Sequence, residues 1–447
     1  MYKCAIEKSR RSLVKMETFV KYLFYTASLL NMSEQCTNAK YPYENHLATK
    51  TPYRIVANGT FGEVQYEGCT PVKAWMIVRH GTRNPSISFI EQYNNRLPQV
   101  RDLILENAKP DGNLHERDLD LFRNWKSRVD EEDDKKLRQE GEEEMMLLAE
   151  RMQSRFPEVF DHIYSNTSYK FKYTHTQRTR KSAKYFTTGL FGKQTAKHVW
   201  YPAPSKKDPI LRFYKLCSKW KTTVKDQPLP EKDKFMESQP WKKVVENVKK
   251  RLNLTDELTE DDIQSMYTGC AFETAWNKNA KSPWCSVFSL EDFKTLEYLE
   301  DLKYYYRDGY GHELTYKQAC PAFNDLIDFF ESSDPYPKST VYFTHSGTLL
   351  KMLAHLRLYR DEMPLTADKY PYENRLWRSS KIDAFATNLA FILYKCANDY
   401  KVLTLHQERI IRLPCCPNSD LCDLKTMKKF YQESIESCDF NAMCANS

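Results

Sequence analysis

The segment from Arg79 to Pro85 reads Arg-His-Gly-Thr-Arg-Asn-Pro and places a potential nucleophile between two guanidinium groups. A neutral imidazole such as that of His80 can attack phosphorus. Arg79 and Arg83 can each bind phosphate oxygens through paired hydrogen bonds while negative charge develops on them. Burying these guanidiniums without an anion would cost free energy, so the spacing favours a phosphate site over a histidine of the hydrophobic core. It predicts phosphoryl transfer at His80.

The elements around this loop are expected to present it to an anion. Residues 72–78 are typical of a buried strand, and residues 87–107 have helix-forming composition. Gly81 permits a tight turn between them, where backbone N–H groups at the helix start can bind phosphate. A second predicted strand, Val341 to Phe343, leads to His345. Because ligands of α/β sheets bind beyond the carboxyl ends of the strands, we expect both histidines at one site.

Several motifs of the chain resemble those of the histidine acid phosphatase superfamily. Arg79 to Pro85 resembles its Arg-His-Gly-x-Arg-x-Pro signature, and Thr176-Gln177-Arg178, with Ser182, Ala183, Phe186, Gly189 and Leu190, resembles the segment that supplies a third phosphate-binding arginine. The resemblance implies that Arg178 binds phosphate together with Arg79 and Arg83. It also implies that His345 adds a hydrogen-bond donor to the same phosphate group.

Within this superfamily the chain is similar to the multiple inositol polyphosphate phosphatases, over about residues 41–412. The similarity rests on residues 281–285, 296–303, 309–311, 348–350, 364–367 and 388–394. It implies an acid phosphatase that hydrolyses inositol polyphosphates, phytate and lower inositol phosphates included, through a phosphohistidine at His80. The compound 2,3-bisphosphoglycerate is a further candidate substrate. No metal or other cofactor is expected, since three arginines and a histidine can neutralise the transferred charge.

The chain departs from the family pattern directly after His345. Other members carry an acidic residue there, and the similar branch uses His-Ala-Glu, whose glutamate is implied to protonate the leaving group. Here Ser346 and Gly347 occupy the two expected acidic positions, so the proton donor is unknown. Losing a positioned general acid lowers a rate by about 10²–10⁴-fold.

Three interpretations of this departure stay open. The enzyme takes its acid from another segment, or it is slow and prefers better leaving groups such as aryl phosphates. The third alternative is a secreted pseudoenzyme that binds polyphosphates without turnover.

The separation of the two histidines predicts the domain organisation. A chain of 447 residues with only 12 glycines and no Gly/Ser-rich or Pro-rich linker favours one domain, residues 34–447, with a helical insertion at about 116–297. Strands at 389–394 and 402–405 and a helix at 349–358 complete the expected pattern. We predict an α/β fold whose mostly parallel sheet is covered by helices on both faces. A Cys-rich tail, 413–447, follows.

The N-terminal segment resembles a secretory signal peptide. A basic stretch, residues 3–15, precedes an uncharged run at 22–33, which is too short to span a bilayer. We expect cleavage near Ser33, with Met16 as an alternative start. Secretion is the expected localisation, and membrane association through an uncleaved signal anchor is the alternative.

Cysteines and sequons agree with the secretory pathway. Twelve of the 13 cysteines follow the leader, and an even set predicts disulfides. A zinc site within residues 415–444 is the alternative, but paired Cys-x-x-Cys spacing and histidine are both missing there. Asn58, Asn166 and Asn253 are predicted N-glycosylation sites.

The formal net charge of +7 suits a polyanionic small molecule or an anionic surface. Nucleic acid is not expected as a partner, because basic and acidic residues are interleaved and nucleic-acid-binding signatures are missing. The sequence makes no prediction about oligomeric state, and no stable membrane insertion is expected after signal cleavage.

Overall fold

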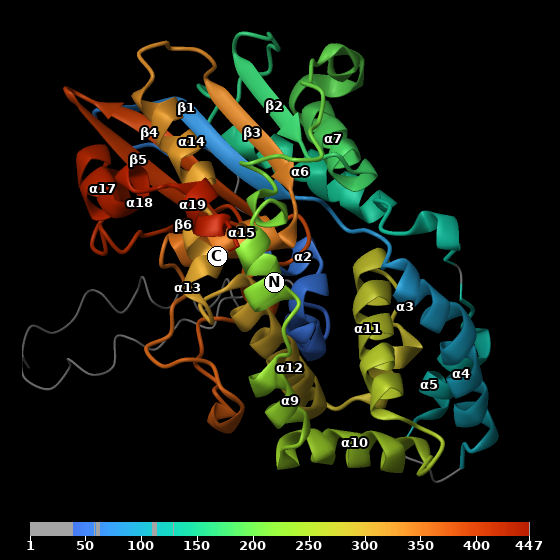
Figure 1. Cartoon of the computed structure of the whole chain (residues 1–447). Coiled ribbons are helices and arrows are strands. Elements are labelled where there is room, and N and C mark those ends of the chain that lie inside the picture. The colour runs from blue at the N-terminus through green and yellow to red at the C-terminus, as the bar shows by residue number, and fades with distance from the viewer. Residues whose placement is uncertain (1–38, 58, 60–62, 110–113, 128, 447) are drawn as a thin grey trace, which may run out of the picture.

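The centre of the structure, a computed structural model, is a seven-stranded sheet in the order β2-β3-β1-β4-β5-β6, with β7 paired to β5 (Figure 1). The structure describes residues 39–57, 59, 63–109, 114–127 and 129–446. The strands are β1 (Cys69–Arg79), β2 (Tyr169–Tyr173), β3 (Ser339–Thr344), β4 (Asn388–Cys396), β5 (Asp399–His406), β6 (Arg409–Ile411) and β7 (Leu421–Asp423).

The sheet is mixed. Strands β1 and β2 both run parallel to β3, and the register places Arg79 opposite Thr344. Strand β4 runs antiparallel to β1, and β5, β6 and β7 continue antiparallel. The α/β fold is confirmed, but the expectation of mostly parallel strands is wrong. Strands β4, β5 and β6 follow one another through two-residue turns, which can join only antiparallel neighbours.

Alternate residues of β1 face two different hydrophobic layers. Trp75 and Ile77 belong to one buried cluster, whereas Met76 and Val78 belong to another, as the two-residue period of a strand requires. Helices α6 (Gln139–Arg155) and α7 (Gln177–Thr195) pack on the second layer, and α14 (Cys320–Glu331) and α15 (Ser346–His355) pack on the first. The prediction of helices on both faces is therefore confirmed.

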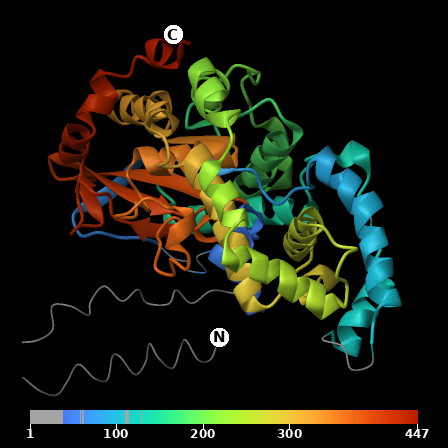
Figure 2. The same ribbon diagram turned by 60° about the horizontal axis from the view of Figure 1, so that its bottom comes forward.

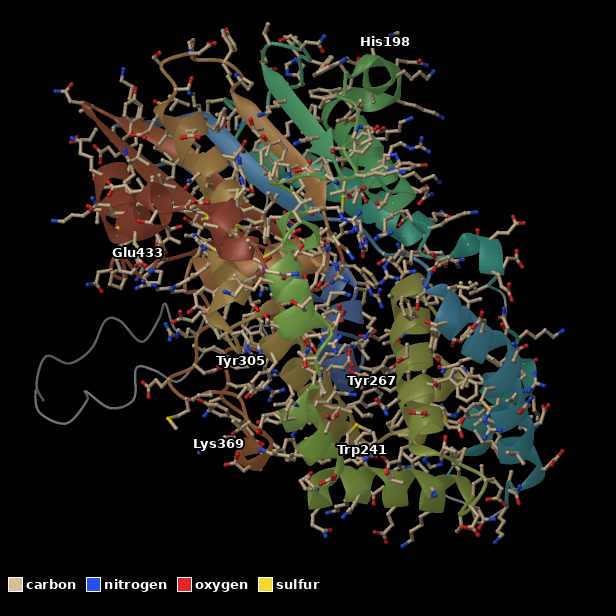
Figure 3. All side chains as sticks on the ribbon, viewed as in Figure 1. His198, Trp241, Tyr267, Tyr305, Lys369 and Glu433 are labelled. Atoms are coloured by element: carbon tan, nitrogen blue, oxygen red, sulfur yellow. A yellow bond between two sulfur atoms is a disulfide. The ribbon has the colours of Figure 1, made fainter. Side chains whose placement is uncertain are left out.

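A group of helices lies beyond one end of the sheet (Figure 2). It comprises α3 (Ile87–Glu91), α4 (Leu97–Glu106), α5 (Glu116–Asn124), α9 (Pro230–Met236), α10 (Gln239–Leu252), α11 (Glu260–Trp276) and α12 (Leu290–Asp308). Trp241 and Tyr267 are buried among these helices (Figure 3). Most of the described span between 116 and 297 is helical, but it also contributes β2 to the sheet.

Several shorter α-helices lie between these elements and in the C-terminal tail. They are α2 (Tyr53–Val56), α8 (Ser218–Trp220), α13 (Glu313–Lys317), α16 (Ser379–Ile382), α17 (Leu424–Phe430), α18 (Gln432–Glu436) and α19 (Phe440–Cys444). Disulfides attach the tail to the body of the protein through the pairs Cys217–Cys444 and Cys320–Cys438.

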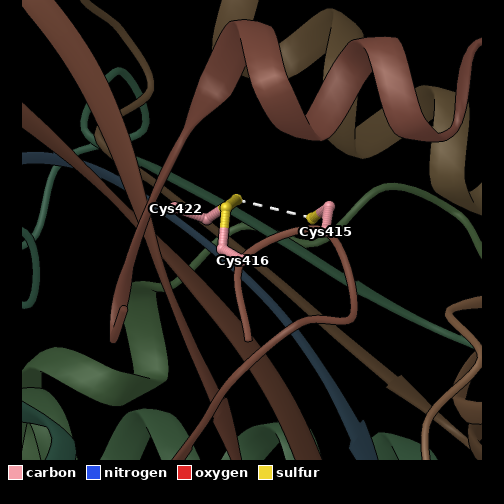
Figure 4. A group of neighbouring side chains, drawn as sticks. All are labelled: Cys415, Cys416 and Cys422. Atoms are coloured by element: carbon pink, nitrogen blue, oxygen red, sulfur yellow. Dashed lines mark hydrogen bonds between the residues drawn. A yellow bond between two sulfur atoms is a disulfide. The ribbon is translucent and has the colours of Figure 1, made fainter. Parts of the chain in front are cut away.

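Ten cysteines form disulfides, as the even cysteine set predicted. The three further bonds are Cys69–Cys396, Cys270–Cys285 and Cys416–Cys422. Cys415 is a free thiol beside Cys422, and Cys36 lies outside the described residues. The sulfurs of Cys415, Cys416 and Cys422 lie close together, but two of them are bonded to each other (Figure 4). The disulfide therefore removes the thiolates that zinc would need.

The predicted signal peptide, residues 1–33, and Asn58 lie outside the described residues. Asn166 and Asn253 are exposed, as attached glycans require. Within the described residues, none of the helices combines the length and the apolar character needed to cross a membrane.

Candidate active site

Strands β1 and β3 bring the two predicted histidines together. Arg79 ends β1, and the backbone N–H of His80 donates to the Thr344 carbonyl at 3.0 Å. His345 follows β3 and caps the start of α15, so both side chains emerge at the carboxyl ends of neighbouring parallel strands. Their ring centroids are 5.6 Å apart.

The loop after His80 is fixed by close contact with α6. A Cβ atom added to Gly81 would lie 2.4 Å from the Gly141 carbonyl oxygen, so only glycine fits there. The partly buried Glu144 carboxylate accepts hydrogen bonds from the Thr82 N–H at 2.7 Å and from the Thr82 hydroxyl at 2.9 Å. The Gly81 N–H donates to the Ser182 hydroxyl at 3.2 Å. These contacts hold His80 and Arg83 at a defined position.

The hydrogen bonds of His80 identify its free nitrogen. Nδ1 lies 2.9 Å from the Gly81 carbonyl oxygen, which can only accept, so Nδ1 carries the hydrogen. Nε2 of the neutral ring then keeps its lone pair. Burial, followed by the charge of Arg178 and the other arginines, holds the pKa of His80 well below its usual value. The imidazole is therefore a neutral potential nucleophile even in acidic solution.

His345 is engaged at both ring nitrogens. Arg178 Nη2 donates to Nδ1 at 3.2 Å, and Nε2 lies 2.9 Å from the Thr174 hydroxyl oxygen. Because a guanidinium only donates, Nδ1 accepts and Nε2 carries the hydrogen. Burial and the charge of Arg178 lower the pKa of His345 as well.

The three predicted arginines surround His80 with little hydrogen bonding of their own. Each has a buried Nε atom without a hydrogen-bond partner among the described residues. Arg79 lies over the Phe385 ring at 4.7 Å and Arg83 over the Phe272 ring at 5.8 Å. Burial, followed by the charge of neighbouring arginines, lowers the pKa of Arg83 to about 9 and that of Arg178 to about 10. Both stay charged at neutral and acidic pH.

Only Arg79 of the three has a carboxylate near enough for an ion pair within the described residues. Its Nη1 lies 3.4 Å from Asp383 Oδ2 and donates to the Asp383 carbonyl at 2.5 Å. No described carboxylate lies within 4.0 Å of the Arg83 or Arg178 guanidinium. Buried positive charge in excess of negative charge is costly unless an anion binds, so this arrangement is suited to phosphate.

Asp383, which no sequence pattern indicated, lies beside Ser346, the first of the two positions where an acid was expected. It follows α16, its side chain is fully buried, and the Ser346 hydroxyl is hydrogen-bonded to its Oδ2. Burial raises the pKa of Asp383 to about 7, although the Arg79 charge opposes the shift. No sequence motif marks this residue, since 37 positions separate it from Ser346.

Asp308, also missed, lies beside the second of these positions. A Cβ atom added to Gly347 would lie 3.1 Å from Asp308 Oδ1. This carboxylate forms an ion pair with the fully buried Lys351, whose ammonium lies 4.3 Å from the Trp220 ring centroid. Two carboxyl groups therefore lie beside the Ser346-Gly347 dipeptide, Asp383 at Ser346 and Asp308 at Gly347.

A further arginine, Arg212, extends the positive region and was not expected from the sequence. Its charge contributes to the lowered pKa values of Arg178 and His345. Three residues further along the chain, burial followed by the charge of Arg212 lowers the pKa of the Lys215 ammonium. Arg212 precedes a short 3-10 helix, Phe213–Lys215, and its sequence carries no recognisable pattern, so only the folded structure places Arg212 beside Arg178.

Sequence comparisons give consistent relatives. A family model described as the histidine phosphatase superfamily, branch 2, matches residues 73–413. Multiple inositol polyphosphate phosphatase 1 of Drosophila melanogaster is 36% identical over 384 residues, which cover 83% of this chain and 81% of that protein. The Homo sapiens protein of the same name is 28% identical over 405 residues, covering 84% of this chain and 82% of that protein.

Solved structures share the fold. The phytase from D. castellii superposes with a TM-score of 0.71 at 18% identity, covering 94% of this chain and 92% of that chain. The multiple inositol polyphosphate phosphatase of Bifidobacterium longum in complex with inositol hexasulfate gives a TM-score of 0.64 at 16% identity, covering 86% of this chain and 97% of that chain.

Proposed function

The chain belongs to the histidine phosphatase superfamily, branch 2, and within it to the multiple inositol polyphosphate phosphatases, and we propose that it hydrolyses phosphomonoesters of inositol polyphosphates. The observation that carries the proposal is the neutral His80, whose Nε2 lone pair lies among three arginines that have more positive charge than nearby carboxylates can neutralise. Such a site can bind a phosphate group and attack it.

In the proposed first step, His80 Nε2 attacks phosphorus and the alcohol of the inositol ring leaves. Arg79, Arg83 and Arg178 hold the oxygens of the transferred group. When phosphate binds, Arg178 turns from His345 Nδ1 to the phosphate. His345 can then adopt the tautomer that carries its hydrogen on Nδ1, and this N–H donates to the same phosphate group. Water then hydrolyses the phosphohistidine. The chain's own cations carry the charge stabilisation, so the mechanism requires no metal.

Additional positive charge beside the cluster supports a polyphosphate over a simple monoester. Arg212 lies near Arg178, and Lys215 lies near Arg212, so further phosphates of the same substrate can reach this positive region. Phytate and lower inositol phosphates have this charge distribution, and 2,3-bisphosphoglycerate is a smaller candidate of the same kind. Two relatives with large coverage are named multiple inositol polyphosphate phosphatase 1.

We also propose that the mature chain begins near residue 34 and acts in the secretory pathway or outside the cell. Five disulfides support an oxidising compartment. Exposed Asn166 and Asn253 are accessible for glycosylation.

A polyphosphate-binding pseudoenzyme is the second candidate, because Ser346 and Gly347 stand at both expected positions of the acid. Phosphate release from phytate, 2,3-bisphosphoglycerate and an aryl phosphate by the purified protein at acidic pH separates the two. We expect release from all three and none from His80→Ala. Saturable phytate binding without release from any substrate would instead identify the pseudoenzyme.

A further inference from the structure

We propose that Asp383 supplies the leaving-group proton through the Ser346 hydroxyl, so that these two residues replace the acid missing after His345. The inference rests on the proposed phosphatase activity and names a part of that site that no family motif marks. Ser346 would be the catalytic residue in contact with the leaving oxygen. Asp383 would act through it as proton source and positioning residue.

The first support is the position of the two side chains. Ser346 directly follows His345, and its partly buried hydroxyl is bonded to Asp383 Oδ2. The backbone after Asp383 runs along the nucleophile, since the Ala386 N–H donates to the His80 carbonyl at 3.2 Å and the Arg79 N–H to the Thr387 carbonyl at 2.8 Å. The hydroxyl and the carboxyl therefore border the phosphate cradle.

The second support is an unused polar atom. Asp383 Oδ1 is buried and has no hydrogen-bond partner among the described residues. A buried, ionised carboxylate would normally have both oxygens satisfied, whereas a protonated carboxyl leaves less charge uncompensated. The carboxyl is thus suited to hold a proton that Ser346 can receive.

The third support is electrostatic. Burial raises the pKa of Asp383 to about 7, Arg79 lowers it, and the charge of Asp308 raises it. Arg79 on β1 and Asp308 at the end of α12 are the charged groups that face it from neighbouring elements, and the Ser346 hydroxyl faces it from α15. A carboxyl that is protonated in acidic solution can donate where an unshifted aspartate would already be ionised.

The step balances in atoms and charge. As His80 Nε2 forms its bond to phosphorus, the bond between phosphorus and the ester oxygen breaks, and its electron pair stays on that oxygen. The oxygen takes the Ser346 hydroxyl proton, and the Ser346 oxygen takes the Asp383 proton. The resulting carboxylate lies beside Arg79. When water attacks the phosphohistidine, its proton returns to Asp383 by the same path.

Asp308 is the competing donor, because it lies directly beside Gly347. Its carboxylate, however, is already paired with the buried Lys351 ammonium. This ion pair directs the Asp308 carboxylate toward Lys351 and away from the hydroxyl of Ser346. The two carboxyls therefore have different partners, and Asp383 is the one bonded to the hydroxyl that follows His345.

The test compares leaving groups, because an aryl alcohol barely needs protonation whereas an inositol alcohol does. We expect Asp383→Asn and Ser346→Ala each to lower kcat/KM for an inositol phosphate by about 10²-fold or more. The aryl phosphate should lose less than about 10-fold. Ser346→Ala removes only a hydroxyl group and should not disturb folding, so it still tests the proposal if Asp383→Asn fails to fold.

Asp301→Asn is the matched control. Asp301 is equally buried and also contacts one serine hydroxyl, of Ser379, and one guanidinium, of Arg375. It lies outside the proposed machinery, so its variant should leave the ratio of the two activities unchanged among folded molecules.

A rescue variant and a pH profile complete the test. Ser346→Asp combined with Asp383→Asn moves the carboxyl by one side chain and should restore at least 10-fold of the lost inositol phosphate activity. In the wild type that activity should fall as pH rises through about 7, where Asp383 loses its proton. Because the charge of Asp308 raises the pKa of Asp383, Asp308→Asn should shift this loss of activity to lower pH. In acidic solution the variant should keep the wild-type ratio of inositol phosphate activity to aryl phosphate activity.

Equal losses on both substrates in Asp383→Asn and Ser346→Ala would reduce Asp383 to a support for Arg79 and overturn the proposal. A leaving-group effect confined to Asp308→Asn would assign the acid to Asp308. Wild-type turnover of aryl phosphate but not inositol phosphate would also overturn it, while leaving a phosphatase. Absence of turnover on both substrates would instead contradict the proposed function.

Discussion

Two buried charged clusters in this protein are built on opposite principles. Around Glu297, the carboxylate accepts from Arg378 at 2.7 Å, from Arg375 at 3.3 Å and contacts His46 at 2.8 Å. Around His80, three guanidiniums lie together, and among the described residues only Arg79 has a carboxylate partner within ion-pair distance. Both sites are removed from water, so their difference is one of charge balance.

The pKa shifts express this difference. The guanidiniums of Arg378 and Arg375 hold the pKa of Glu297 below its usual value despite complete burial, and the pKa of Arg375 is raised. The pKa values of Arg83 and Arg178, in contrast, are lowered by burial and by neighbouring arginines. The cluster around Glu297 is complete within the protein and stabilises the fold. The cluster around His80 lacks negative charge, which a phosphate group can supply.

Arg375→Ala should have the largest effect on stability. It leaves Asp301 buried without its guanidinium partner and removes one of the two guanidiniums from Glu297, which costs about 3–5 kcal/mol in the free energy of unfolding. Denaturant unfolding measures this loss, and kcat of the folded fraction should change little. A fully stable variant would remove the distinction between the two clusters.

Arg178→Ala should show the reverse pattern. Removing one donor to the transferred phosphate should lower kcat/KM by about 10²–10³-fold. Without bound ligand the variant should be as stable as the wild type or about 1 kcal/mol more stable, because like charges are relieved. Steady-state kinetics and denaturant unfolding on one preparation check both parts, and a large stability loss with retained activity would contradict them.

A polyanion should stabilise the arginine cluster specifically. Inositol hexasulfate at about 100 times its Kd should raise the free energy of unfolding by about 2.7 kcal/mol. Thermal unfolding at constant ionic strength, with sodium sulfate as the control, measures the effect. It should be much smaller in Arg178→Ala and unchanged in the Lys242→Ala surface variant, which is exposed on α10. Equal stabilisation of all three proteins would indicate a nonspecific salt effect.

The pH dependence of stability should report on Asp383. Its pKa is about 7 in the folded protein and about 3.8 when unfolded, so the folded state binds the extra proton between these values. Stability therefore falls as pH rises from about 4 to about 7. As pH rises from 5 to 7, the free energy of unfolding of Asp383→Asn should fall by about 2 kcal/mol less than that of the wild type. Equal slopes would show that Asp383 is ionised throughout this range.

The sequence predicted the parts of the site that depend on residues close together in the chain. Arg79, His80 and Arg83 share one loop, and a strand before His80 and another before His345 imply a common edge of the sheet. Hydrophobic runs likewise identified β1, β3, β4 and β5. The direction of the strands was not predicted correctly, because β4 and β5 are as apolar as the parallel strands. The tight turn between β4 and β5 is what makes them antiparallel.

The surroundings of the site could not be predicted because packing alone creates them. Asp383 meets Ser346 across 37 positions and Lys351 meets Asp308 across 43. Neither aspartate belongs to a motif, and Arg212 lies in an irregular segment. Such contacts depend on how α12, α15 and the segment after α16 pack, which periodicity does not encode.

Trapping the covalent intermediate would test directly whether His80 is the nucleophile. Rapid acid quenching would destroy a phosphohistidine, so the reaction with labelled inositol phosphate is stopped in alkaline denaturant and the peptides are mapped. We expect acid-labile phosphate on the peptide that contains Arg79 to Pro85, and no label in His80→Ala. Label on another residue, or undiminished turnover in His80→Ala, would contradict it.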